Sequence, residues 1–293
     1  MGKILITGAT GHLGKATIDF LLKRGIILDE ISALVRDAGK AKDLKGKGIN
    51  LIIGDYSDYN SLVEAFTGVE KLFFISSNDV LNRTLHHENV IKAALQADVK
   101  HIIYTGVLSN VPIEKSAIAP VTEAHKKTEE QLVASGLSYT LLRNNLYMDL
   151  VPQFIGEKVL DTEMVFFPAG NGKVAFVLRS EIAEAAANLL STQGHEGKTY
   201  NITNVEAYSY QQLADYISEI TGKNIKYVSP DPEEFSEVLK NAGAPANMIG
   251  AFTAFALAQA QDEFNVTGND FVGLLGREPK NLKEYLTEIY ANK

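Results

Sequence analysis

Residues 1–25 read MGKILITGATGHLGKATIDFLLKRG and place three glycines three residues apart, at Gly8, Gly11 and Gly14. A short apolar run, Ile4–Ile6, precedes them, and an amphipathic helical pattern follows. Gly8 permits a sharp turn, Gly11 avoids a clash with a pyrophosphate, and Gly14 lets the helix pack against the strand. The free N–H groups and the dipole of the helix then favour an anion. This context predicts a dinucleotide-binding turn rather than a merely structural one.

Strand-length apolar runs alternate with helical patterns through the first half of the chain. The runs are continuously apolar, which is typical of strands covered by helices on both faces. The sequence therefore predicts an α/β fold, a Rossmann-type doubly wound parallel sheet with a smaller α/β C-terminal domain. The expected strands are Lys3–Thr7, Ile31–Val35, Ile49–Ile53, Lys71–Ser76, His101–Thr105 and Tyr139–Leu142, and the expected later helices are Leu62–Phe66, Leu85–Ala97 and Ala124–Ala134.

The second half is less regular. We expect an NAD(P)-binding domain over residues 1–150 and a smaller substrate-side domain over 151–293, with part of 173–203 rejoining the main sheet. An Ala-rich segment near the end reads as a buried helix. The expected strands are Val174–Leu178 and Thr199–Ile202, and the expected helices are Ser180–Leu190, Tyr210–Ile220, Glu233–Asn241 and Ala246–Phe264.

Composition excludes several classes of function. The 293 residues include no cysteine, so disulfides, thiolate nucleophiles and Cys-based metal sites are absent. The net charge of −8 disfavours nucleic acid as a partner. No apolar stretch is long enough to span a membrane and no export signal begins the chain, so we expect a cytoplasmic protein. His86 and His87 lack partners at metal spacing and are expected on the surface, so no metal site is predicted.

The end of the second expected strand bears on the choice of nicotinamide cofactor. Arg36 stands where an acidic residue would take the ribose of NAD, and a guanidinium there suits the 2′-phosphate of NADP. The sequence therefore predicts NADP, with NADPH preferred over NADH, although Asp37 follows at once and Arg36 could be a solvated loop charge. The other predicted cofactor contacts are Thr10, His12, Leu13, Asp55, Ser76, Ser77, Asn78 and Thr105.

Two of these contacts have a simpler structural alternative. Asp55 could accept a hydrogen bond from adenine, or it could cap the following helix, a role that Ser57 fills equally well. The small polar residues Ser76, Ser77 and Asn78 could leave room for a ribose, or they could only form a turn.

The usual catalytic pair of short-chain dehydrogenases is missing. In a Tyr-x-x-x-Lys motif, the lysine lowers the tyrosine pKa so that the tyrosine can pass a proton to the substrate. None of the 12 tyrosines has lysine four residues later, and the nearest approach is Tyr139 with Arg143. His125 stands in the equivalent helix.

Short motifs in a specific order carry a resemblance to a known family. They are ILITGATGHLG (4–14), ALVR (33–36), VEKLFFISS (69–77), HIIYTG (101–106), His125-x-x-Thr-Glu129 and YTLLRN (139–144), continued by AGNGK (169–173) and GHEGKTY (194–200). Together they resemble the NmrA-like atypical short-chain dehydrogenases, closest to the type 2 quinone oxidoreductases and triphenylmethane reductase. The likeness covers nearly the whole chain and weakens after about Gly243.

The resemblance implies a Rossmann domain, a small C-terminal domain with a substrate cleft between them, and NADPH-dependent reduction of quinones or dyes. The partner is then a small-molecule acceptor, and a homodimer is compatible with the sequence. The chain departs from the family at Gly106, where a polar residue often follows the threonine, so Thr105 is left as the only hydroxyl there.

Quinone or dye reduction agrees with the missing pair. A quinone accepts hydride readily and can take protons from water, so the protein mainly holds cofactor and acceptor together. Thr105, His125 and Asn144 are the candidate catalytic residues, and Tyr147 and Met148 could line the acceptor pocket. Each has a structural alternative. His125 could be a histidine on a helix surface, and Asn144 could serve only to form a turn. Tyr147 and Met148 could belong to the core.

Two other functions stay open at this point. A non-catalytic, NmrA-like redox sensor would bind oxidised and reduced dinucleotide and a partner protein, and it needs no Tyr-x-x-x-Lys motif. A sugar epimerase is the least favoured, because its chemistry requires the tyrosine.

Overall fold

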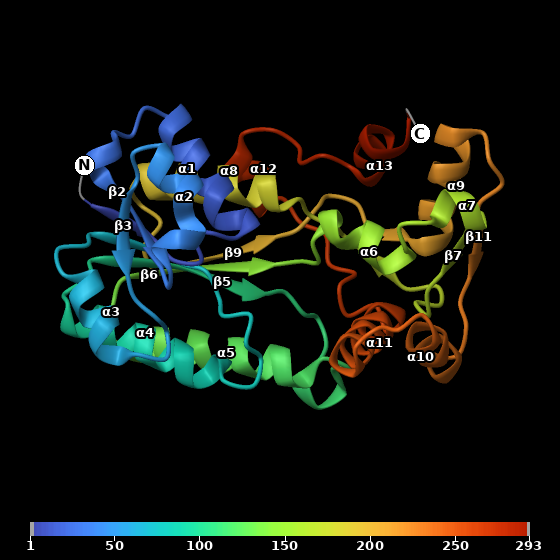
Figure 1. Cartoon of the computed structure of the whole chain (residues 1–293), viewed down its shortest axis with the longest axis horizontal. Coiled ribbons are helices and arrows are strands. Elements are labelled where there is room, and N and C mark those ends of the chain that lie inside the picture. Colours follow the sequence, from blue (N-terminus) through green and yellow to red (C-terminus); the bar gives the residue numbers. More distant parts are fainter. Residues whose placement is uncertain (1–2, 292–293) are drawn as a thin grey trace.

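The computed structural model describes residues 3–291 and is built on a seven-stranded parallel sheet (Figure 1). The ends of the two predicted domains, residues 1–2 and 292–293, lie outside the described residues. The strand order is β3-β2-β1-β4-β5-β6-β9, so the direction of winding reverses between β1 and β4. The strands are β1 (Ile4–Ile6), β2 (Ile31–Val35), β3 (Asn50–Ile53), β4 (Lys71–Phe74), β5 (His101–Val107), β6 (Tyr139–Asn144) and β9 (Lys198–Ile202).

Helices cover both faces of this sheet (Figure 1). One face carries α1 (His12–Lys23), α2 (Lys42–Gly46), α8 (Arg179–Ser191) and α12 (Asp270–Leu275), and the other carries α3 (Tyr59–Phe66), α4 (Arg83–Gln96) and α5 (Ala119–Ala134). The predicted doubly wound α/β fold is therefore confirmed. The expected burial on both faces is wrong for β3 and β9, whose residues are largely exposed or half-buried because both strands lie at edges of the sheet.

The remaining elements form a second, mostly helical region at one end of the sheet (Figure 1). Two small sheets pair β7 (Met164–Phe166) with β11 (Lys226–Val228) and β8 (Lys173–Val174) with β10 (Tyr208–Ser209). Aromatic side chains such as Phe154, Phe167 and Tyr210 form the core of this region. Its helices are α6 (Val151–Ile155), α7 (Val159–Thr162), α9 (Tyr210–Thr221), α10 (Pro232–Asn241), α11 (Ala246–Ala260) and α13 (Leu282–Tyr290).

Two predicted elements of the second half differ in the structure. The expected strand Val174–Leu178 stops at Val174, and beyond it only an isolated bridge joins Val177 to Tyr147. The Ala-rich helix ends at Ala260, and only its second half is buried. The domain boundary at residue 150 stays a prediction, and β9 pairs with β6 in the main sheet.

Short 3-10 turns join several elements and place the residues of the site. They are η1 (Leu28–Glu30), η2 (Ala38–Ala41), η3 (Ile113–Lys115) and η4 (Met148–Leu150). None of the helices within residues 3–291 combines the length and the apolar character that a bilayer crossing requires.

Candidate active site

The glycine turn connects β1 to α1 at the point where the winding of the sheet reverses. Gly8 has a φ of +57°, a conformation that side chains rarely adopt. A Cβ on Gly14 would lie 2.5 Å from the Gly8 carbonyl oxygen and 2.7 Å from the Ala9 Cα. A Cβ on Gly11 would meet only the Gly8 oxygen, at 3.3 Å. The backbone conformation therefore requires glycine at position 8, and the close packing of the turn on the helix requires it at position 14. Contacts within the protein give little reason for glycine at position 11.

The N-terminus of α1 is open. Gly11 is its N-cap residue, no side chain caps it, and its first turn contains no acidic residue. Thr10, Gly11 and His12 are exposed, while Leu13 packs into the core. The first N–H groups of a helix lack intrahelical partners. This turn therefore offers exposed backbone donors at the positive end of a helix dipole, which suits a phosphate.

The ends of β2 and β3 carry Arg36 and Asp55. Arg36 is exposed, and no hydrogen bond or ion pair engages its side chain among residues 3–291. Asp37 does not compete for that role, because its side chain accepts a hydrogen bond from the Gly39 N–H at 2.7 Å and caps η2. The guanidinium of Arg36 is therefore available to an anionic ligand.

Asp55 is held in a local turn. Its carboxylate accepts hydrogen bonds from the N–H and the hydroxyl of Ser57, at 2.8 and 2.7 Å. Burial opposes ionisation of Asp55, but these hydrogen bonds outweigh it and lower the pKa of the carboxyl. The structural alternative, in which Asp55 or Ser57 caps the following helix, is wrong, because the side chain of Asp58 caps α3.

Hydrogen bonds hold the carboxyl ends of β1, β4 and β5 together. The Thr7 hydroxyl donates to the Phe73 carbonyl at 3.1 Å and accepts from the Ile75 N–H at 2.9 Å. The Thr105 hydroxyl accepts from the Ser76 N–H at 3.0 Å and is almost completely buried. The structure therefore shows Thr105 positioning the segment after β4.

Ser77 is fully engaged by the protein. Its N–H donates to His87 Nε2 at 2.9 Å, its hydroxyl lies 3.1 Å from His86 Nδ1, and its carbonyl accepts from Arg83 Nε at 2.8 Å. Ser76 is half-buried and Asn78 is exposed. Of the three predicted ribose contacts, Ser76 and Asn78 therefore keep accessible surface, and Ser77 shapes the turn.

A buried polar network lies behind this turn, between α4, β5 and α5. The expected surface position of His87 is wrong: its side chain is 0% exposed, because it faces the sheet and packs on Phe74 and Tyr104. His125 is 6% exposed, so the surface alternative for it is wrong as well.

The hydrogen bonds fix the tautomers of both histidines. His87 Nε2 accepts from Ser77, so its Nδ1–H donates to the Thr128 hydroxyl at 2.8 Å, and that hydroxyl donates to the Ala124 carbonyl. Arg83 Nη1 lies 3.4 Å from His125 Nε2 and must donate to it. The Nδ1–H of His125 then donates to the Tyr104 oxygen at 2.6 Å.

Arg83 is the one permanently charged member of this network. Burial lowers the pKa of His87 to about 2, with the charges of neighbouring groups adding to the effect. Burial and the Arg83 charge lower the pKa of His125 to about 3. Burial raises the pKa of Tyr104 above its ordinary range. At neutral pH both histidines and the tyrosine are therefore neutral, and Arg83 retains its positive charge.

Asn144 and Tyr147 lie at the carboxyl end of β6. Asn144 is 3% exposed, its Nδ2 donates to the Tyr147 hydroxyl at 3.4 Å, and its buried Oδ1 has no partner among residues 3–291. The guanidinium of Arg179 lies over the Tyr147 ring, 5.5 Å from its centroid. Met148 is completely buried in the core of the second region, which matches the core alternative for that residue.

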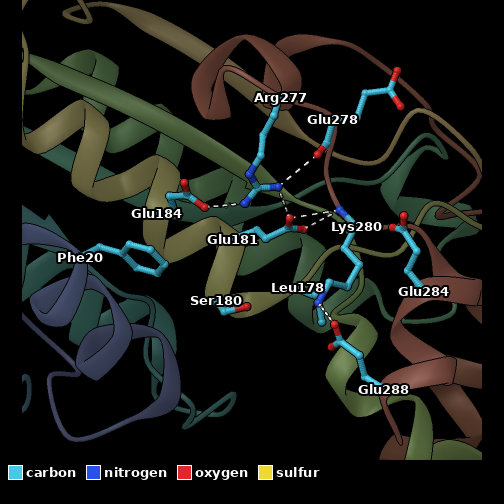
Figure 2. A pocket seen from close by; sticks show the side chains of 10 residues that line it. All are labelled: Phe20, Leu178, Ser180, Glu181, Glu184, Arg277, Glu278, Lys280, Glu284 and Glu288. Atoms are coloured by element: carbon cyan, nitrogen blue, oxygen red, sulfur yellow. Dashed lines mark hydrogen bonds and ion pairs between the residues drawn. The ribbon is translucent and has the colours of Figure 1, made fainter. Parts of the chain in front are cut away.

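Two cavities of the described structure contain none of the predicted site residues. A charged cavity of about 550 Å³ lies at α8, where Arg277 reaches between Glu181 and Glu184, at 2.5 Å from each (Figure 2). These ion pairs join the segment before α13 to α8, so they have a structural role. An apolar cavity of about 380 Å³ lies between α6, α7, α10 and α11 and is lined by Phe154, Phe166, Phe235 and Phe252, among others.

Sequence reasoning missed Arg83, His87 and Tyr104. Arg83 and His87 are four residues apart and therefore share a helix face, which was an available signal. Nothing local to Tyr104 separates it from an ordinary strand tyrosine. Its hydroxyl becomes part of the network only when α5 packs over β5.

Comparisons with known proteins match nearly the whole chain. A family model described as the NmrA-like family matches residues 1–286. Quinone oxidoreductase 2 of Escherichia coli (strain K12) is 38% identical over 289 residues, covering 98% of this chain and 98% of that protein.

Solved structures are similar over the same length. The triphenylmethane reductase of Citrobacter sp., complexed with NADP(H), superposes with a TM-score of 0.90 at 35% identity, covering 98% of this chain and 99% of that one. The NADPH-dependent quinone oxidoreductase QOR2 of Escherichia coli, complexed with NADPH, superposes with a TM-score of 0.91 at 34% identity and the same coverage.

Proposed function

The chain belongs to the NmrA-like family, and from that premise we propose that it is an NAD(P)H-dependent oxidoreductase that reduces quinone-like or dye-like acceptors by hydride transfer. The observation that carries the proposal is the open N-terminus of α1 at the switch point of the sheet. Dinucleotides bind at this position in doubly wound folds.

The residues present fit NADP. The turn from Gly8 to Gly14 would hold the pyrophosphate, and the unengaged guanidinium of Arg36 would hold the 2′-phosphate. Asp55 would lie on the adenine side, and Ser76 and Asn78 beside the nicotinamide ribose. The unpartnered Oδ1 of Asn144 is a buried acceptor that a bound amide donor would satisfy. When bound, NADPH supplies the hydride.

The protein side chains at this site hold neighbouring groups in place rather than transfer protons. His125 has its Nδ1 proton bound to Tyr104 and its Nε2 lone pair taken by Arg83, so it has no proton to give in this arrangement. Thr105 holds the Ser76 backbone. Such a site suits an acceptor whose oxygens take protons from water, as a quinone does, better than one that needs a strong protein acid.

The preference for NADPH over NADH also belongs to this proposal and depends on Arg36. The cytoplasmic location and the homodimer stay predictions.

A steady-state assay tests the proposal. The purified protein is mixed with NADPH and a benzoquinone, a naphthoquinone or a triphenylmethane dye, and loss of the near-ultraviolet absorbance of NADPH is followed. We expect saturable turnover above the rate without protein for at least one of these acceptors. Tight binding of both NADPH and NADP⁺ without turnover of any acceptor would instead support a non-catalytic redox sensor.

A further inference from the structure

Arg83, the first residue of α4, holds a positive charge inside the protein without forming an ion pair to any residue in the described range 3–291. Its side chain is 7% exposed. Burying an unpaired charge is costly, so such charges are usually compensated. Burial lowers the pKa of Arg83, and the charge of Asp79 offsets this in part without forming an ion pair. The remaining compensation has to come from neutral groups or from a bound ligand.

Neutral groups hold only part of the guanidinium. Nε donates to the Ser77 carbonyl at 2.8 Å, and Nη1 donates to His125 Nε2 at 3.4 Å. Nη2 has no hydrogen-bond partner among the described residues. It is not completely buried, in contrast to the unpartnered Oδ1 of Asn144. One side of the guanidinium is thus fixed by the protein, and Nη2 keeps some accessible surface and a free donor capacity.

The position of Arg83 separates it from the phosphate-binding turn. Its partners follow β4 and lie on α5, whereas Gly8 follows β1 and Arg36 follows β2. The charge of Arg83 also reaches Tyr147, at the end of β6, where it partly offsets the effect of burial on the pKa of that tyrosine. Arg83 therefore belongs to the β4–β6 side of the switch point, where the nicotinamide and the acceptor belong.

We propose that Arg83 is a catalytic residue that donates a hydrogen bond, through Nη2, to the oxygen of a quinone as that oxygen becomes negatively charged. The inference deepens the proposed function and rests on it. Two electrons and one proton pass to the quinone as hydride, NADPH becomes NADP⁺, and the quinone becomes a hydroquinone monoanion. A proton from water then completes the hydroquinone. A fixed cation aimed at the developing oxyanion stabilises that transition state.

His125 is a positioning residue in this scheme. Its neutral ring, oriented by Tyr104, fixes Arg83 from one side, while the Ser77 carbonyl fixes it from the other. The imidazole ring must be neutral, because a protonated imidazole has no lone pair to accept from Arg83 and would repel the guanidinium.

Acceptor chemistry distinguishes this role from a general effect on folding. Hydride transfer to a cationic triphenylmethane dye neutralises the acceptor and creates no oxyanion. Arg83 then offers no stabilisation, and its charge opposes binding of the dye. Loss of the charge should slow quinone reduction without slowing dye reduction.

The experiment compares wild type with Arg83→Met, Arg83→Lys and the matched control Arg24→Met. Arg24 is an exposed arginine at the C-terminal end of α1, the helix end away from the glycine turn, and it donates a hydrogen bond to Ser191. We expect kcat for benzoquinone to fall on the order of a hundredfold in Arg83→Met, as on removal of one oxyanion donor. Arg83→Lys should recover part of the loss, and Arg24→Met should stay near wild type. Affinity for NADPH should be unchanged in all variants.

A binding measurement complements the kinetics and needs no turnover. Para-nitrophenolate resembles the hydroquinone monoanion, and its visible absorbance reports its ionisation. On the NADP⁺ complex of the wild type, the bound phenol should ionise at lower pH than the free phenol, and Arg83→Met should abolish that shift. Arg83→Gln serves as the neutral variant if Arg83→Met lowers the melting temperature.

Three results would overturn the assignment. One is quinone turnover within about twofold of wild type in a folded neutral variant. The second is an NADPH affinity that falls as much as the turnover, which would make Arg83 a cofactor ligand. The third is a phenol whose ionisation is the same in wild type and variant. Absence of turnover in the wild type, with the phenol shift intact, would instead count against the proposed function alone.

Discussion

The two halves of the carboxyl edge of the sheet are built in different ways. On the β1–β3 side, the turn at Gly8, the open N-terminus of α1, Arg36 and Asp55 are largely accessible and depend on local backbone geometry. On the β4–β6 side, Arg83, His125 and Asn144 are buried and depend on contacts between separate elements. The first half is suited to bind a charged ligand from solvent, and the second is suited to fix a few groups around a reaction.

The largest effect is expected in the glycine turn, where the local geometry is least tolerant. Gly14→Ala places a Cβ 2.5 Å from the Gly8 carbonyl oxygen, so the helix and the turn must separate. We expect a loss of about 3 kcal/mol in the free energy of unfolding, as for a severe overpacking, together with loss of NADPH binding. Chemical denaturation and NADPH titration measure the two effects.

Gly11→Ala is the matched control, because its Cβ meets only one backbone atom, at 3.3 Å. Its unfolding free energy should stay within about 1 kcal/mol of wild type, while NADPH binding weakens. Equal destabilisation by both substitutions would mean that Gly11 is needed for folding rather than for the cofactor.

Removing the charge of Arg36 tests the accessible half of the site. Arg36→Ala should remove a charge-assisted hydrogen bond of about 1.5–3 kcal/mol, so NADPH affinity should fall roughly ten- to a hundredfold. NADH lacks the 2′-phosphate and should bind nearly as before. The loss should shrink at high salt, because a partly exposed ion pair is screened. Similar losses for NADH and NADPH would make Arg36 structural and withdraw the cofactor preference.

The buried half should respond to pH instead. The pKa of His125 is about 3 in the folded protein, below the unfolded value near 6.5. Its stabilising contribution is therefore complete above about pH 6.5 and is lost as the pH falls toward 3. Between about pH 7.5 and about pH 5, the advantage of wild type over His125→Gln should shrink by about 2 kcal/mol.

Denaturant unfolding at the two pH values measures this difference. A gap that does not change with pH would mean that His125 is not buried as a neutral group, and the contrast between the two halves would weaken.

The smallest effect concerns a helix cap on the accessible side. Asp58 caps α3, whereas Ser57 bonds Asp55. Asp58→Ala should cost about 1 kcal/mol of stability and leave NADPH binding intact. Ser57→Ala should cost less stability and act on Asp55 instead. A larger loss of stability in Ser57→Ala would reverse the two roles.

The same contrast explains what the sequence could predict. The seven strands of the main sheet, the glycine turn and the place of Arg36 after β2 follow from local signals, and the structure has these strands within two residues of the predicted bounds. The buried network does not, because Arg83, His87 and Tyr104 gain their roles from the packing of α4 and α5 on β5. The sequence predicts a surface position for His87 because a pair of adjacent histidines on a helix does not indicate which of the two faces the sheet.

Strand ends and the second region show the same limit. β5 and β6 run two residues further than predicted, because Gly106 and Val107 pair with Arg143 and Asn144 across strands that are distant in sequence. The two-stranded sheets β7–β11 and β8–β10 were not predicted, because their strands are only two or three residues long. Such short runs lack a periodic pattern that could reveal them.

The central claim is that the accessible half holds NADPH while the buried half promotes hydride transfer to a quinone. A single-turnover measurement tests it most directly: the protein saturated with a stoichiometric amount of NADPH is mixed with benzoquinone, and the near-ultraviolet absorbance of NADPH is followed. We predict a decay much faster than that of free NADPH with the same quinone, and slower again with NADPH deuterated at the transferred position. A decay no faster than that of free NADPH with the same quinone would contradict the claim.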